Sequence, residues 1–92
     1  MYSKQTVVRN KSGLHARPAS DLVKAALKYR SVIEVYKTAA PEKKINIKSL
    51  VLLLSLSASC GDELTLCANG PDETEAVDAL AALIESGFGE EE

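Results

Sequence analysis

The chain is short of the residues on which many enzymes and membrane proteins depend. Its 92 residues include no tryptophan, four aromatic residues, two cysteines and a single histidine. No apolar run approaches the roughly 20 residues of a membrane helix, since Leu50–Leu54 spans only five. The first residues also lack the apolar core of a signal peptide. We therefore expect a cytoplasmic protein that does not insert into a membrane, with a core too small for a deep substrate cavity.

The two cysteines do not form a metal-binding or redox motif. Cys60 and Cys67 are seven positions apart without a C-x-x-C pair, and the only histidine, His15, is distant in the sequence. Because zinc sites need more ligands at closer spacing, we expect packed, reduced thiols and no metal site. Nothing in the composition implies a cofactor.

Basic residues are absent from the second half of the chain. All eleven lysines and arginines lie between Lys4 and Lys48, which gives that part a net charge of +8, while the remainder carries −10. A positive region suits a phosphate or an acidic protein surface. The acidic half would repel nucleic acid, and few aromatic residues are available to stack on bases, so nucleic acid is not an expected partner.

Hydrophobic periodicity predicts four strands and three helices. The expected strands are Lys4–Arg9, Ser31–Thr38, Lys43–Ile47 and Asp62–Ala68, and the expected helices are Ala16–Tyr29, Leu50–Leu56 and a last helix from Asp72 to about Gly87. This order predicts an α+β open-faced sandwich, with the helices on one face of a four-stranded antiparallel sheet. We expect a single domain over residues 1–88 and a frayed acidic tail over residues 89–92.

Each predicted helix is preceded by a polar residue at its N-cap. Ser49 and Asp72 are preferred capping residues, and Asp72 is followed three positions later by Glu75. His15 occupies the same position before the first helix, although histidine is not a preferred cap. Both Ser49 and His15 therefore have a purely structural interpretation, as helix caps.

The stretch Gly13–Ala19 favours a second interpretation of His15. The free N–H groups and the positive dipole end of a helix attract an anion, and Pro18 lies in the first turn, where its missing N–H costs little. Arg17 adds a permanently charged donor for phosphate oxygens. Since a neutral imidazole is a nucleophile near neutral pH, His15 is a candidate phosphoryl acceptor.

These residues resemble the HPr family, the histidine phosphocarriers of the bacterial phosphoenolpyruvate:sugar phosphotransferase system. The stretch Gly13–Ala19 matches the active-site signature of that family, and Ile47–Leu50 followed by Ser55–Leu56 matches its regulatory serine segment. The resemblance extends from about Lys4 to Ser86.

The resemblance implies a carrier without turnover of its own. His15 would accept a phosphoryl group from Enzyme I at Nδ1 and pass it to the EIIA domain of a sugar permease, while Arg17 would hold the phosphate. Ser49 would be a regulatory site for an HPr kinase/phosphorylase, with a catabolite-control transcription regulator as a further partner. The implied docking residues are Lys24, Lys48, Leu50, Val51 and Leu54.

Three features depart from the family pattern. Val51, Leu52 and Leu54 replace residues that are often Met or Gly, and we expect some of them to be exposed, because so short an apolar helix cannot bury every side. The connection Thr38–Lys44 is longer than usual. Asp21 places a negative charge near His15 where a neutral residue is more common.

Two other functions remain open from the sequence. The chain could be a regulatory HPr-like binding protein that acts through Ser49 phosphorylation and docking, with His15 secondary, although the retention of His15, Arg17 and Pro18 together argues against that as its sole role. A small α+β domain that binds RNA or a metabolite is the weakest alternative.

Overall fold

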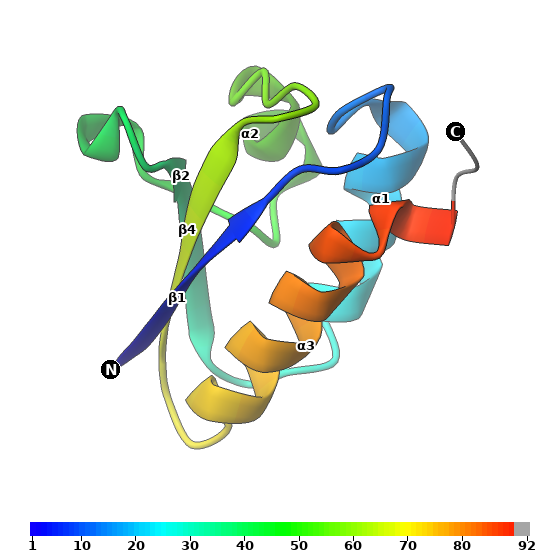
Figure 1. Cartoon of the computed structure of the whole chain (residues 1–92). Helices are drawn as coiled ribbons and strands as arrows, with labels where there is room; N and C mark the ends of the chain where they lie inside the picture. Colours follow the sequence, from blue (N-terminus) through cyan, green and yellow to red (C-terminus); the bar gives the residue numbers. More distant parts are fainter. Residues whose placement is uncertain (90–92) are drawn as a thin grey trace.

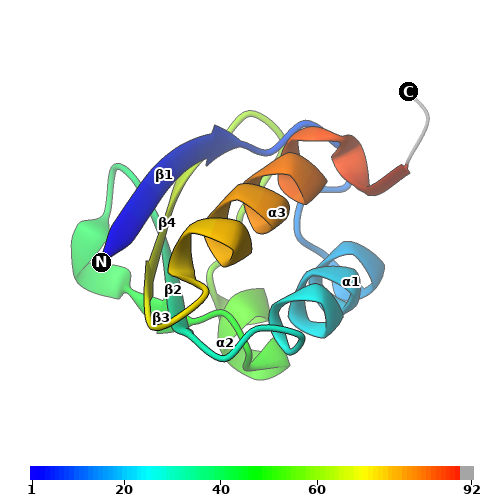
Figure 2. The same cartoon turned by 90° about the horizontal axis from the view of Figure 1, so that it is seen from below.

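The computed structural model of the protein describes residues 1–89. Its elements are β1 (Tyr2–Val7), α1 (Ala16–Ala26), β2 (Val32–Lys37), the 3₁₀ helix η1 (Pro41–Lys43), β3 (Ile45–Asn46), α2 (Leu50–Ser55), β4 (Glu63–Asn69), α3 (Glu73–Glu85) and the 3₁₀ helix η2 (Gly87–Gly89). The strands form one antiparallel sheet in the order β1-β4-β2-β3. Figures 1 and 2 show α1, α2 and α3 on the same face of this sheet. The predicted open-faced α+β sandwich is confirmed.

The core lies between the sheet and the helices. Alternate residues of the strands face inward, as the period of two in a half-buried strand requires. The buried strand residues include Ile33, Val35, Leu64, Leu66 and Ala68, and the helices cover them with Ala19, Leu22, Ala26, Leu53, Ala76, Val77, Leu80 and Ile84. Thr6 and Val8 are also buried, on the one face that the sequence predicts for them. This packing fixes the start of α1 and the start of α2 at the surface.

Helix α1 ends earlier than its sequence pattern predicts. The predicted helix runs to Tyr29, but the N–H groups of Lys28 and Tyr29 donate to carbonyls only three residues back, which tightens the chain out of the α-helix. Leu27, which the apolar spacing places on the inner face, is the C-cap residue and is 61% exposed.

The connection between β2 and β3 contains η1, an element that the sequence pattern does not predict. Pro41–Lys43 turns as a short 3₁₀ helix, so that the predicted strand Lys43–Ile47 is reduced to Ile45–Asn46. Figures 1 and 2 show this connection on the side of the sheet away from the helices. The longer connection therefore leaves the helical face unchanged.

Asp72 precedes α3, as predicted, but it does not cap the helix. Its side chain makes no capping hydrogen bond and instead accepts from the Arg30 and Ser31 N–H groups and from the Ser31 hydroxyl, at 2.9, 3.0 and 2.5 Å. The hydrogen bond from the Ser31 hydroxyl, followed by that from the Arg30 N–H, holds the pKa of the Asp72 carboxyl below its usual value. Asp72 thus ties the loop before β2 to the start of α3.

No helix in residues 1–89 is long and apolar enough to cross a membrane. Of the predicted acidic tail, Gly89 lies in η2 and residues 90–92 lie outside the described residues.

Candidate active site at the start of helix α1

His15 occupies the N-cap of α1, as the sequence predicts. Its backbone is extended, with φ of −89° and ψ of −166°, and its carbonyl accepts the first intrahelical hydrogen bond, from Ala19 N–H at 2.8 Å. The imidazole is exposed and makes no capping hydrogen bond. The imidazole therefore adds no capping hydrogen bond to the start of α1, and His15 acts as a cap only through its backbone.

The loop before His15 is held in one shape by residues distant in the sequence. Gly13 has φ of +67°, and a Cβ atom there would lie 2.6 Å from the Ala58 carbonyl oxygen. That same oxygen accepts from Leu14 N–H at 2.9 Å, and the Asn10 amide donates to the Gly13 carbonyl at 2.8 Å. Only glycine fits this backbone without strain, so the approach to His15 is preorganised.

The first turn of α1 offers free donors beside the imidazole. The N–H groups at the start of a helix have no intrahelical partner, and Pro18 contributes none. The N–H groups of Ala16 and Arg17, together with the positive end of the helix dipole, therefore favour an anion next to His15. The exposed Arg17 guanidinium adds a full positive charge to this end of the helix.

Arg17 borders a hollow that sequence reasoning does not find. The hollow is lined by Arg17, Pro18, Asp21, Phe88 and Gly89, and His15 is not among its lining residues. The 3₁₀ helix η2 follows α3 and brings residues 88 and 89 beside α1, where they line the hollow. Phe88 has a φ of +58°. Local sequence patterns carry no signal for a contact between positions this far apart.

Ser49 caps α2, also as predicted. Its hydroxyl accepts a hydrogen bond from Leu52 N–H at 3.3 Å, and its carbonyl accepts from Leu53 N–H at 2.9 Å. The serine side chain is half-buried. In contrast to the imidazole of His15, this hydroxyl is already engaged in closing a helix end.

Between these two helix starts lies an exposed apolar surface on α2. Leu53 is fully buried, whereas Leu50, Val51, Leu52 and Leu54 are exposed, and Val51 is 77% exposed. We call Leu50, Val51 and Leu54 the α2 apolar surface. Helix α2 begins at Ser49, and the segment that follows it reaches the His15 loop through Ala58. The exposure expected for these residues is confirmed.

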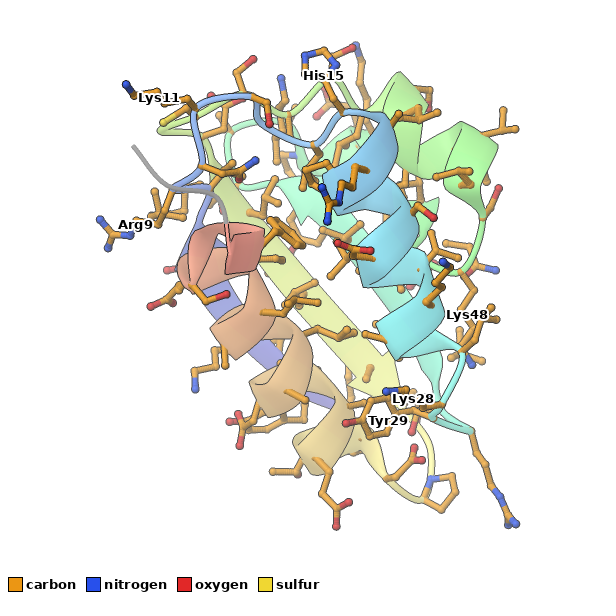
Figure 3. The ribbon with its side chains drawn as sticks, turned by 90° about the vertical axis from the view of Figure 1, so that its right-hand side faces the viewer. Arg9, Lys11, His15, Lys28, Tyr29 and Lys48 are labelled. Atoms are coloured by element: carbon orange, nitrogen blue, oxygen red, sulfur yellow. The ribbon has the colours of Figure 1, made fainter. Side chains whose placement is uncertain are left out.

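The lysines predicted to assist docking are not gathered around His15. Lys48 donates through Nζ to the Tyr29 carbonyl at 2.8 Å, beyond the C-terminal end of α1, and Lys24 lies exposed in the last turn of that helix. Figure 3 shows His15 and Lys11 toward one end of the molecule and Lys28, Tyr29 and Lys48 toward the other. Lys11 is thus a basic residue at the His15 end that no sequence motif indicates.

The cysteines and acidic residues of the described part of the chain are the residue types that could form a metal centre. Cys60 and Cys67 are free thiols. Within residues 1–89, no group of three or more histidine, cysteine, aspartate or glutamate side chains is placed to hold a metal ion. Among the described residues, His15 and Arg17 are therefore the candidates for a chemical function.

Comparisons with known proteins show which proteins this chain is similar to. Residues 2–86 match the family described as "PTS HPr component phosphorylation site". The phosphocarrier protein HPr of Treponema pallidum is 37% identical over 91 residues, which cover 99% of this chain and 100% of that protein. The HPr-like protein Crh of Halalkalibacterium halodurans is 44% identical over 85 residues, 92% of this chain and 98% of that protein. A crystal structure of HPr from Thermoanaerobacter tengcongensis covers both chains fully, with a TM-score of 0.92 and 47% identity.

Proposed function

This chain belongs to the HPr family of the phosphotransferase system, and from that membership we propose that His15 carries a phosphoryl group between other proteins. HPr proteins are phosphocarriers and not catalysts. The single observation that supports the proposal most is the exposed His15 imidazole, free of a capping hydrogen bond, at a helix start that favours an anion.

The proposed transfer needs little covalent machinery on this chain. A ring nitrogen of neutral His15, Nδ1 by analogy with the family, attacks the phosphorus atom of phosphorylated Enzyme I. The new N–P bond forms as the N–P bond on Enzyme I breaks, so the electron pair returns to the donor histidine. Such a step depends on the positioning of the two proteins and on stabilisation of the negative charge of the phosphoryl group. The N–H groups of the first turn and the Arg17 guanidinium would provide that stabilisation. An EIIA domain then attacks the phosphohistidine in the same way.

We propose the α2 apolar surface as the docking site for Enzyme I and EIIA domains. Leu50, Val51 and Leu54 are exposed together on a short helix, and the segment after this helix reaches the His15 loop through Ala58. A partner that covers these residues would therefore also lie close to the imidazole. Lys24 and Lys48 supply positive charge on the α1 side, which suits acidic partners.

Ser49 is proposed as a regulatory phosphorylation site for an HPr kinase/phosphorylase. A phosphate on its hydroxyl would stand at the start of α2, where the helix dipole favours it, and the helix would remain folded. The added charge would lie beside the α2 apolar surface, and it would hinder Enzyme I while favouring a catabolite-control transcription regulator.

The test of the carrier function is phosphorylation in a defined mixture. The protein is incubated with phosphoenolpyruvate and Enzyme I, and intact-mass spectrometry follows the gain of one acid-labile phosphoryl group. His15→Ala should abolish that gain, and Ser49→Ala, as the matched control, should leave it unchanged. Acid-labile labelling that persists in His15→Ala would overturn the assignment.

A second function, a regulatory binding protein, is favoured by one specific observation. The Crh proteins of Halalkalibacterium halodurans and Bacillus subtilis are 44% and 42% identical to this chain, so overall similarity alone does not separate carrier from regulator. The regulator would take an acid-stable phosphate from the kinase and ATP, lost in Ser49→Ala, and would then bind the transcription regulator. An inert His15 in the Enzyme I assay, together with that binding, would favour this second function.

We further propose that residues 1–88 act as one phosphocarrier domain and that the protein works in the cytoplasm. Enzyme I and phosphoenolpyruvate, the donors that the proposal requires, would have to be present in the same compartment.

A further inference from the structure

The peptide group between Gly13 and Leu14, directly before His15, is held at both of its ends. Its carbonyl oxygen accepts a hydrogen bond from the Asn10 side-chain amide at 2.8 Å, and its N–H group donates to the Ala58 carbonyl at 2.9 Å. Because a peptide group is planar, two hydrogen bonds at opposite ends fix its orientation. Asn10 therefore acts directly on the backbone that leads into His15.

Asn10 makes further contacts that hold it in this place. Its own carbonyl accepts from the Gly13 N–H group at 3.1 Å, and its amide also donates to the Ser12 hydroxyl at 3.1 Å. The side chain is 1% exposed, and a Cβ atom built at Gly87 would lie 3.8 Å from the Asn10 Cβ. The start of η2 thus packs behind Asn10, so its side chain has little room to turn away from the loop.

Only one half of this buried amide is used within the described part of the chain. The Nδ2 group of Asn10 donates the two hydrogen bonds given above, but no group of residues 1–89 donates to its Oδ1 atom. A buried acceptor without a donor costs free energy, so an apolar side chain of similar size would serve the stability of this position nearly as well. What an apolar side chain cannot supply is the hydrogen bond that orients the Gly13 carbonyl.

We propose that Asn10 is a positioning residue for phosphoryl transfer: it orients the peptide group before His15 and thereby sets where the imidazole stands beside the free N–H groups of α1. This inference rests on the proposed carrier function. Asn10 is buried, so it cannot itself contact Enzyme I or the phosphoryl group. Any effect of its amide on the transfer has to act through the position of His15, and displacement of a reacting group by about 1 Å is enough to slow a reaction considerably.

Kinetics with Enzyme I test this role. The kcat and KM of Enzyme I are measured with phosphoenolpyruvate as the donor and with this protein as the acceptor. Asn10→Leu, which keeps the size of the side chain and removes the amide, should lower kcat on the order of tenfold. The KM for the acceptor should stay within about twofold, because the α2 apolar surface is unchanged. An unchanged kcat, with or without a change in KM, overturns the inference.

Thr6→Val is the matched control for stability. Thr6 is also a buried polar residue, and its hydroxyl forms a hydrogen bond with Glu85 Oε2 at 3.0 Å. Its replacement should lower the urea midpoint at least as much as Asn10→Leu does and leave kcat unchanged. Equal losses of kcat in the two variants would make Asn10 a merely structural residue and overturn the inference. If Asn10→Leu does not fold, Asn10→Ala takes its place in each measurement.

Hydrogen exchange gives a readout that does not depend on Enzyme I. The hydrogen bond to Ala58 should protect the Leu14 N–H group in the wild-type protein. Asn10→Leu should speed its exchange on the order of tenfold relative to the amides of the central strand β4, whereas Thr6→Val should leave that ratio unchanged. Unchanged relative protection of Leu14 refutes the role of Asn10. If Enzyme I does not phosphorylate the wild-type protein, the carrier function is refuted instead, and the exchange ratio still decides whether Asn10 holds the loop.

Discussion

Helices α1 and α2 begin in opposite ways, although each start carries a candidate phosphate acceptor. At α2 the Ser49 hydroxyl accepts a hydrogen bond from Leu52 N–H and closes the helix end. At α1 the His15 imidazole makes no capping hydrogen bond and stands exposed. A side chain that caps a helix is already engaged, whereas one that does not leaves both itself and the free N–H groups available to an anion.

Ser49 and His15 represent two ways in which a helix start can present a residue that is a candidate for phosphorylation. Ser49 contributes to stability before any modification, so its chemistry is added to a structural role. His15 contributes through its backbone carbonyl, which any residue could supply, and its side chain is left for chemistry. The helix start of His15 is in turn supported from outside, by the contact of Gly13 and Leu14 with Ala58.

The largest expected difference between the two helix starts is chemical. His15→Ala should abolish acid-labile phosphorylation completely, because no other imidazole exists in the chain. Its free energy of unfolding should change by no more than about 0.5 kcal/mol, since an exposed side chain without a hydrogen bond is removed. Urea unfolding and the Enzyme I assay measure the two quantities. A loss above about 1 kcal/mol would make His15 a structural residue after all.

A substitution in the loop before His15 should lower the free energy of unfolding more than a substitution at the Ser49 cap. Gly13→Ala places a Cβ atom against the Ala58 carbonyl and forces a left-handed backbone on alanine, so we expect a loss of about 2 kcal/mol. Gly61→Ala is the control, because Gly61 also has a positive φ but faces open space. Urea midpoints of the two variants isolate the Ala58 contact. Equal losses would show that the contact with Ala58 does not matter.

Removal of the Ser49 cap should have an intermediate effect. Ser49→Ala should cost about 1 kcal/mol of unfolding free energy, and Ser49→Asp should recover most of it, because aspartate caps a helix as well as serine does. Ser55→Ala serves as the control, since the Ser55 hydroxyl is exposed and only donates to the Leu52 carbonyl. Thermal and urea unfolding give the values. If Ser49→Ala is neutral, the two helix starts are alike in stability.

The smallest expected effect is a change in stability at the start of α3, and it is expected only at acid pH. The pKa of the Asp72 carboxyl is lowered by its hydrogen bonds to Ser31 and to the Arg30 N–H, so its contribution to stability is present above its unfolded value and is lost as pH falls through the lower folded one. We expect the wild-type stability to fall more steeply below about pH 4 than that of Asp72→Asn. Urea midpoints measured across this range, with Glu75→Gln as the control, test the slope. Parallel curves for Asp72→Asn and the wild type would contradict the assignment.

Much of this arrangement could be predicted from local patterns. The spacing of apolar residues gave three helices and four strands, and the preference of serine for the N-cap placed Ser49 correctly. The exposure of Val51 and its neighbours followed from an apolar helix too short to bury every side. These are properties of neighbouring residues, which a sequence displays directly.

What the sequence did not reveal depends on contacts between distant positions. Asp72 has the residue type of a cap, but the Ser31 hydroxyl and the N–H groups before β2 offer its carboxylate a better set of donors. Leu27 fits the apolar stripe of α1, yet the helix ends at this residue and its side chain is exposed. The hollow beside Arg17 requires Phe88, which returns to α1 only after the whole sheet has formed.

The hydrogen bond from Leu14 N–H to the Ala58 carbonyl also has a consequence for the timing of biosynthesis. A ribosome must add more than forty residues after His15 before the partner of its loop exists, and the central strand β4, which joins β1 to β2, is made later still. A partly made chain therefore presents a histidine in an unsupported segment. Under the proposed carrier function, a His15 loop in its final shape, ready for phosphoryl transfer, would therefore be a property of the completed fold alone.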